Sequence, residues 1–248
     1  MECARLNRYG LLSVSGAEAR EFLHAQLTID ILNLPPDRAA LAGWCSAKGR
    51  LLATLLVVPA PQGFLLQLAR DLAPAVAKRL SMFILRAKVK IADQSDSWAQ
   101  FGVWDAPAPA AVTWEKGAVS VPRGESRTLR LEPADASSLV ANADEETWLL
   151  QEIRAGRPLI TAATQDQFVP QMVNLEQLDA VDFRKGCYPG QEIVARAQYR
   201  GQVKRRMVRL PAPAGIRLSP GDEFNGGVVV DSAAGEALAV MPPREGGD

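Results

Sequence analysis

Residues 183–201 read FRKGCYPGQEIVARAQYRG, and the two halves of this stretch have different patterns. The first half carries Gly186, Pro189 and Gly190, which favour a tight irregular turn because glycine reaches positive φ and proline fixes φ. The second half has the apolar spacing of a helix, with Glu192 in its first turn, where a carboxylate complements the helix dipole. We therefore expect a turn that leads directly into a helix.

The expected turn places Cys187 just ahead of a helix N-terminus and two residues from Lys185. A helix N-terminus and a nearby cation both favour the thiolate form of a cysteine. This pattern indicates a functional cysteine. The alternative is a small buried cysteine that packs beneath the turn.

Residues 185–192, KGCYPGQE, resemble the octapeptide of the YgfZ family, folate-binding relatives of the glycine-cleavage T-protein, an aminomethyltransferase. At the fifth position, where the family usually has threonine, this sequence has Pro189, so a hydroxyl contact is lost and the turn is kept. The resemblance covers most of the chain, including QFVPQ at 167–171. The residues that match the family motif are Lys185, Gly186, Cys187, Tyr188, Gly190, Gln191, Glu192, Arg196 and Arg200.

The resemblance implies an α+β fold of three modules around a central folate site, with a small C-terminal β-barrel-like module. It implies that residues 1–92 form the N-terminal part of the folate-binding core and residues 93–164 a central α+β domain. Residues 165–202 would return to the core with the motif, and residues 203–248 would form a short C-terminal β module, trimmed relative to bacterial members of the family. The α+β class also follows from the order of the predicted elements, since strands often follow one another through short turns.

Periodicity and turn signals place the individual elements. Strands are expected at 9–14, 39–45, 50–58, 63–69, 88–91, 98–104, 128–131, 203–210, 227–230 and 237–241. Helices are expected after Gly16, from an N-cap at Asp71 to about residue 85, weakly over 133–141, from an N-cap at Asp144 to Gly156, and after Gly190. Residues 105–126, rich in Pro, Ala and Gly, are expected to be a loop with one short strand.

The resemblance assigns Tyr9 and Trp148 to the folate pocket, where a flat pterin can stack on aromatic faces. Ordinary core aromatics are the alternative for both. The T-protein carries paired aspartates, one of them catalytic, on the strand that corresponds to residues 51–55. Ala53 and Thr54 lie in this run and supply no charge. We therefore expect a folate site without aminomethyl transfer, in a protein that is not a conventional enzyme.

Composition narrows the classes of function. The 248 residues include 28 Lys and Arg and 28 Asp and Glu, so no net charge attracts nucleic acid or an anionic membrane. Three widely spaced cysteines without a C-x-x-C pair indicate reduced thiols and a cytoplasmic protein. No secretory signal pattern and no apolar run long enough to span a bilayer are present, so no membrane partner is expected.

His24 is the single histidine, which excludes a histidine-rich metal site, and we predict no metal site. It lies one residue off the apolar stripe of its predicted helix and is given no role. Nucleophilic catalysis by Cys187 would need a general base, and none is near in sequence. One cysteine cannot by itself saturate an iron–sulfur cluster, so a stably bound cluster is not expected.

A basic segment follows the motif, with no acidic residue at 195–209. Its cations could bind the glutamate tail of folate or an RNA backbone. A solvated helix face followed by an amphipathic strand is the alternative. The cations are Arg196, Arg200, Lys204, Arg205, Arg206 and Arg209.

The resemblance implies a cytoplasmic protein that binds tetrahydrofolate or a derivative and aids the synthesis or repair of iron–sulfur enzymes, including those that thiolate tRNA. Its partners would be folate, iron–sulfur enzymes as clients and, through the basic segment, tRNA. Cys187 and Lys185 would be its functional pair. Three alternatives stay open: a folate-dependent aminomethyltransferase, an RNA-binding module without folate, and a folate-binding protein whose cysteine is inert.

Overall fold

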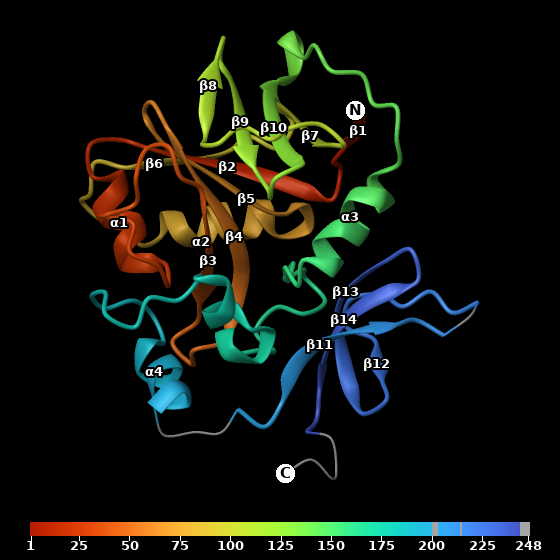
Figure 1. Cartoon of the computed structure of the whole chain (residues 1–248). Coiled ribbons are helices and arrows are strands. Elements are labelled where there is room, and N and C mark those ends of the chain that lie inside the picture. Colours follow the sequence, from red (N-terminus) through yellow and green to blue (C-terminus); the bar gives the residue numbers. More distant parts are fainter. Residues whose placement is uncertain (200–202, 214, 244–248) are drawn as a thin grey trace. The chain divides into compact units, whose positions relative to one another are not determined.

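The computed structural model describes residues 1–199, 203–213 and 215–243. Arg200 and Gly201 of the motif region lie outside these ranges. The strands are β1 (Glu2–Arg5), β2 (Tyr9–Ser15), β3 (Ala40–Cys45), β4 (Leu51–Ala60), β5 (Gly63–Ala69), β6 (Lys90–Asp93), β7 (Trp98–Trp104), β8 (Thr113–Glu115), β9 (Ala118–Pro122), β10 (Arg127–Pro133), β11 (Arg206–Pro211), β12 (Glu223–Phe224), β13 (Gly227–Ala233) and β14 (Glu236–Met241) (Figure 1). The α-helices are α1 (Ala19–Gln26), α2 (Ala73–Ser81), α3 (Glu145–Arg154) and α4 (Gln191–Tyr199).

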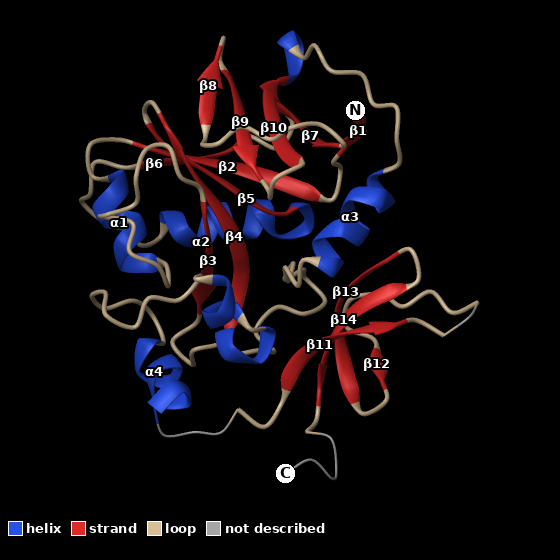
Figure 2. Ribbon diagram, in the orientation of Figure 1, coloured by secondary structure: helices blue, strands red, loops and turns tan. Residues whose placement is uncertain are grey.

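The mixture of helices with antiparallel strands confirms the predicted α+β class (Figure 2). The chain forms two compact units and passes between them several times. Unit 1 comprises Met1–Leu23, Ile31–Ala40 and Leu55–Trp148, and unit 2 comprises His24–Asp30, Leu41–Thr54 and Leu149–Asp248. The four-segment division expected from the sequence stays a prediction.

Unit 1 contains two antiparallel sheets. One has the order β1-β7-β10-β9-β8, and in the other the second half of β4 is followed by β5, β2 and β6. Leu12 of β2 pairs with Leu66 of β5, and both are fully buried in strands that are buried on both faces over most of their length. Two buried amides add a polar link, because Gln67 Nε2 donates to Gln100 Oε1 at 2.8 Å.

Unit 2 contains β3 with the first half of β4, the motif with α4, and a C-terminal sheet of order β11-β14-β13-β12. This sheet is open, because β11 and β12 are its two edges and do not pair with each other in the described part of the chain. A barrel requires its first and last strands to pair. The prediction of a barrel-like module is therefore wrong, although a small core forms around Leu218, Val229 and Ala239.

Three local predictions are wrong. Residues 105–126 hold two strands, because Lys116 (φ 51°) and Gly117 (φ 82°) form a tight hairpin turn between β8 and β9. Asp71 does not cap α2, which begins at Ala73 after a 3-10 turn over Arg70–Leu72. The helix expected over 133–141 is only a 3-10 turn, Ala134–Ala136.

The predicted cap at Asp144 is confirmed, since Asp144 Oδ1 accepts a hydrogen bond from the N–H of Glu146 at 2.9 Å. The short strands β1 and β12 were not expected from the sequence pattern. No helix within the described ranges combines the length and the apolar character that crossing a membrane requires.

Candidate functional site

Cys187 is exposed on a loop of unit 2 between two buried side chains. Lys185 has 8% of its surface exposed and Tyr188 has 6%. The other two cysteines, Cys3 and Cys45, are buried. The loop is thus anchored on both sides of the thiol, and the alternative of a buried Cys187 does not hold.

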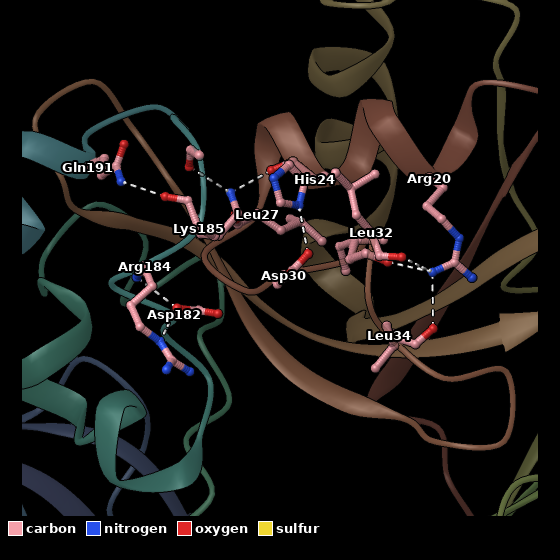
Figure 3. Close-up of polar contacts among 12 residues, drawn as sticks. Arg20, His24, Leu27, Asp30, Leu32, Leu34, Asp182, Arg184, Lys185 and Gln191 are labelled. Atoms are coloured by element: carbon pink, nitrogen blue, oxygen red, sulfur yellow. Dashed lines mark hydrogen bonds and ion pairs between the residues drawn. The ribbon is translucent and has the colours of Figure 1, made fainter.

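Lys185 anchors the loop to the end of α1, whose last turn, from His24, belongs to unit 2. Its Nζ donates to the carbonyl oxygens of His24 at 2.6 Å, Leu27 at 2.9 Å and Gly186 at 3.2 Å (Figure 3). The last carbonyls of a helix have no intrahelical donor, and a lysine can satisfy them. The same ammonium lies 4.7 Å from the ring centroid of Tyr188. Lys185 therefore closes the helix and holds the loop against it.

Burial lowers the pKa of Lys185 to about 8, and the charges of Asp30, Asp182 and Cys187 oppose this shift. The cysteine is thus within electrostatic range of the ammonium. Burial also raises the pKa of Tyr188, with a smaller contribution from Cys45. The buried phenol is accordingly neutral at physiological pH.

Gly190 ends the turn, and only glycine fits there. Its φ is +79°, and a Cβ on it would lie 2.4 Å from the carbonyl oxygen of Ser46 and 2.6 Å from the Gly49 backbone. Gly49 in turn has a φ of +68° and meets Ile193. The motif turn and the β3–β4 turn of unit 2 therefore pack backbone against backbone, which fixes where the loop begins its helix.

The predicted helix after Gly190 is confirmed as α4. Val194 is buried, and its carbonyl accepts a hydrogen bond from Gln171 Nε2 at 2.7 Å. Ile193, expected on the same apolar face, is 43% exposed, although its side chain lies close to Gly49. Glu192 and Arg196 are exposed, and Gln191 Nε2 donates to the carbonyl of Lys185 at 3.4 Å.

His24 lies beside the motif, which the sequence did not indicate. Its Nδ1 is 3.2 Å from Oδ1 of Asp30 (Figure 3), and a Cβ on Gly186 would stand 3.5 Å from its Nε2. The sequence gives only a histidine and an aspartate six residues apart. Their proximity to residue 186 depends on how Lys185 attaches the loop to α1, which no local pattern reveals.

Tyr9 and Trp148, the expected folate-pocket residues, belong to unit 1. The backbone carbonyl of Tyr9 accepts a hydrogen bond from Gln100 Nε2 at 2.9 Å. Trp148 is 2% exposed, with its indole against Gly102 and the guanidinium of Arg127 5.5 Å from its ring centroid. Cys187 lies in unit 2, and a shared folate pocket stays a prediction.

Residues 51–55, the run where the resemblance predicts the change from the T-protein aspartates, are used for packing. Ala53 and Thr54 are buried. Thr54 Oγ1 donates to the carbonyl of Pro158 at 3.0 Å and accepts from the N–H of Ile160 at 3.1 Å. This position holds strand β4 to residues 158–160 and offers no carboxylate.

Part of the basic segment is neutralised. Arg206 pairs with Glu176, and Arg209 Nε lies 3.6 Å from Glu236 Oε2. Arg196 and Lys204 are exposed. Within residues 1–199, 203–213 and 215–243, no group of three or more His, Cys, Asp or Glu side chains could hold a metal ion.

No protein-family model matches the chain. Its curated relatives include the tRNA-modifying protein YgfZ of Serratia proteamaculans, 32% identical over 85% of this chain and 71% of the relative. The proteins of the same name from Klebsiella pneumoniae and Vibrio vulnificus are 32% and 30% identical over 88% and 94% of this chain, and these matches cover 74% and 78% of the relatives.

Among solved structures, the glycine-cleavage aminomethyltransferase T of Bartonella henselae superposes on 97% of this chain and 78% of its own, with a TM-score of 0.74. The two sequences are 14% identical, so this likeness is one of fold.

Proposed function

The chain belongs to the YgfZ family, and from this membership we propose that it binds tetrahydrofolate and acts in tRNA modification. In this role it assists the synthesis or repair of iron–sulfur enzymes, including those that thiolate tRNA. The relatives are named for tRNA modification, and the fold is that of a folate-dependent aminomethyltransferase.

The exposed thiol of Cys187 is the observation that carries the proposal. Lys185, Tyr188 and Gly190 are each used to fix the loop, through carbonyl contacts, burial and a left-handed turn. Cys187 is the side chain that this anchoring leaves exposed. Because the loop is anchored on both sides of an exposed thiol, a chemical role for the sulfur is favoured over a packing role.

A helper function is favoured over aminomethyl transfer, because buried Thr54 stands in the run where the T-protein has acidic residues. Both contacts of its hydroxyl go to backbone groups. A folate bound here would therefore act as ligand or cofactor without the T-protein carboxylate.

Titration of the purified chain with tetrahydrofolate, by calorimetry and by tryptophan fluorescence, tests the folate part of the proposal. We expect saturable binding by the wild type, weaker binding by Trp148→Phe, and unchanged binding by Trp114→Phe, a matched change elsewhere in unit 1. No heat and no quenching with the wild type would overturn folate binding. Steeply salt-dependent tRNA binding without folate affinity would instead support an RNA-binding module.

A further inference from the structure

The loop that joins α2 to β6 in unit 1 (Figure 1) carries an apolar tip, which consists of Met82, Phe83 and Leu85. Met82 and Phe83 are exposed, and Leu85 is 91% exposed. The other exposed large apolar side chains of the described residues occur singly along the chain, which is normal for a protein surface. Three of them within four residues of one loop are instead typical of a surface that another molecule covers.

Backbone hydrogen bonds hold the loop in one conformation. The N–H of Phe83 donates to the carbonyl of Leu80 at 3.0 Å, and the N–H of Ala87 donates to the carbonyl of Ile84 at 2.8 Å. Leu80 is fully buried, so the loop continues directly from an anchored turn of α2. The apolar tip is therefore presented in a fixed arrangement, which lowers the entropy that a partner must remove on binding.

Leu85 is a residue that the fold itself does not favour. Its φ is +48°, in the left-handed region, which glycine or asparagine occupies at a lower cost than leucine. Because the side chain is almost entirely exposed, its burial within the chain does not offset this cost. A residue that breaks a local rule without a gain in packing is expected to serve a contact outside the chain.

Exposed cations flank the apolar tip in sequence. The chain has no acidic residue between Asp71 and Asp93, although its charges balance over the whole length. One carboxylate comes from elsewhere in unit 1, since Glu18 Oε2 accepts a hydrogen bond from the backbone N–H of Lys88 at 2.6 Å. The excess of positive charge beside the tip selects an anionic partner. The exposed cations are Lys78, Arg79, Arg86, Lys88 and Lys90.

We propose that this loop docks reversibly on an anionic lipid bilayer, with the apolar tip in the interface and the cations beside the lipid phosphates. Anchoring at a bilayer surface requires an apolar group together with a polybasic patch, and the loop carries both. A protein partner would have to supply an acidic apolar groove. The proposal goes beyond the proposed function and depends on neither folate nor tRNA. The sequence-based expectation of no membrane partner concerned a spanning segment and the charge of the whole chain, and docking at the surface requires neither.

Co-sedimentation of the full chain with lipid vesicles tests the proposal. Vesicles of equal parts phosphatidylglycerol and phosphatidylcholine are anionic, and vesicles of phosphatidylcholine alone are the neutral comparison. We expect the wild type to sediment with the anionic vesicles, to sediment little with the neutral ones, and to be released as the salt concentration rises, because salt screens the cations.

Leu85→Asn tests the apolar part of the contact. It should lower the partition coefficient on anionic vesicles about tenfold, because the leucine side chain no longer leaves water. Its stability in urea should not fall below that of the wild type, since asparagine suits the left-handed backbone. Val140→Asn is the matched control, because Val140 is another highly exposed apolar residue of unit 1, and it should bind as the wild type does. Met82→Ser replaces Leu85→Asn as the deciding variant if the latter is less stable.

The double variant Arg86→Gln with Lys90→Gln tests the charged part. It should lower the partition coefficient about tenfold or more at low salt. Lys48→Gln with Lys116→Gln is its control, because it removes the same charge from exposed lysines outside the loop. This control should bind as the wild type does.

Equal binding of the wild type to both kinds of vesicle, or binding to neither, would overturn the proposal. Wild-type binding by the deciding apolar variant, or equal losses in the two double variants, would also overturn it. If the wild type ignores vesicles but binds tRNA through Arg86 and Lys90, the loop is an RNA contact. The assay contains no folate, so failure of the folate titration would remove the proposed function and leave this inference standing.

Discussion

Replacing Lys185 by methionine tests whether this residue anchors the motif loop. The change removes the donor of three hydrogen bonds, to the carbonyls of His24, Leu27 and Gly186, and the cation over the ring of Tyr188. Leaving a buried carbonyl without its donor costs about 1–3 kcal/mol. The apolar side chain also relieves the unfavourable burial of an ammonium, which offsets part of this loss. We expect Lys185→Met to lower the free energy of unfolding by about 2 kcal/mol at neutral pH.

The pKa of Lys185 also predicts how the stability difference between wild type and Lys185→Met changes with pH. Burial lowers the pKa of Lys185 from 10.5 to about 8, so the unfolded chain binds more protons than the folded chain between these values. Stability then rises with pH through that window, by at most about 1.4 kcal/mol per pH unit. This contribution to stability is complete above the unfolded pKa of 10.5 and is lost as the pH falls through the folded pKa of about 8. The difference between wild type and Lys185→Met should therefore widen from about pH 8 to about pH 10.

Urea unfolding followed by circular dichroism at a series of pH values measures both effects. Lys48→Met is the matched control, because Lys48 is an exposed lysine of the same unit. Its stability should stay within about 0.5 kcal/mol of wild type at each pH. Equal stability of wild type and Lys185→Met at neutral pH, or a difference that stays constant to about pH 10, would refute the reasoning.

Four further substitutions test the packing that holds the loop, the aromatic core of unit 1 and the start of α3. Gly190→Ala should lower the free energy of unfolding by about 2 kcal/mol or more, because its φ is +79° and its Cβ meets Ser46, whereas Gly186→Ala should change it by less than about 0.5 kcal/mol. Gly102→Ala should lower it by about 3 kcal/mol and shift the tryptophan emission, because the new Cβ would lie 2.3 Å from the Trp148 ring. Asp144→Ala should lower it by about 1 kcal/mol through loss of the N-cap.

The same urea titrations check these four changes. Equal stabilities for the two glycine variants would show that the left-handed turn is not what fixes Gly190. An unchanged emission spectrum in Gly102→Ala would show that the indole has room to move. A wild-type value for Asp144→Ala would mean that the start of α3 is held by its tertiary contacts.

The sequence predicts features that depend on neighbouring residues. Asp144 caps α3 because its side chain reaches an N–H two residues on, and the turn at Gly190 leads into α4 because glycine alone suits its φ. Each signal lies within one turn of the chain. Two predictions failed where such a local signal is weak. In residues 105–126, strands β8 and β9 are too short for a periodic pattern. In residues 133–141, the apolar residues do not have the spacing of a helix, and only a 3-10 turn forms.

The contacts around the motif loop join residues that are far apart in sequence. Local sequence patterns therefore could not predict them. Lys185 was expected to act on Cys187, two residues away, yet its Nζ donates to a carbonyl 161 residues earlier in the chain. His24 was given no role because no acid or cysteine stands in helical register with it. Its neighbours Asp30 and Gly186 come from the exit of the helix and from the motif, and only the folded chain brings them together.

Nucleoside analysis of tRNA from cells that lack their own YgfZ protein tests most directly whether Cys187 is the working group. Such cells would be supplied with this chain as wild type, as Cys187→Ala or as Lys48→Met, at matched protein levels. The account predicts that wild type and Lys48→Met restore thiolated nucleosides, while Cys187→Ala folds normally and does not restore them. Full restoration by Cys187→Ala would contradict it.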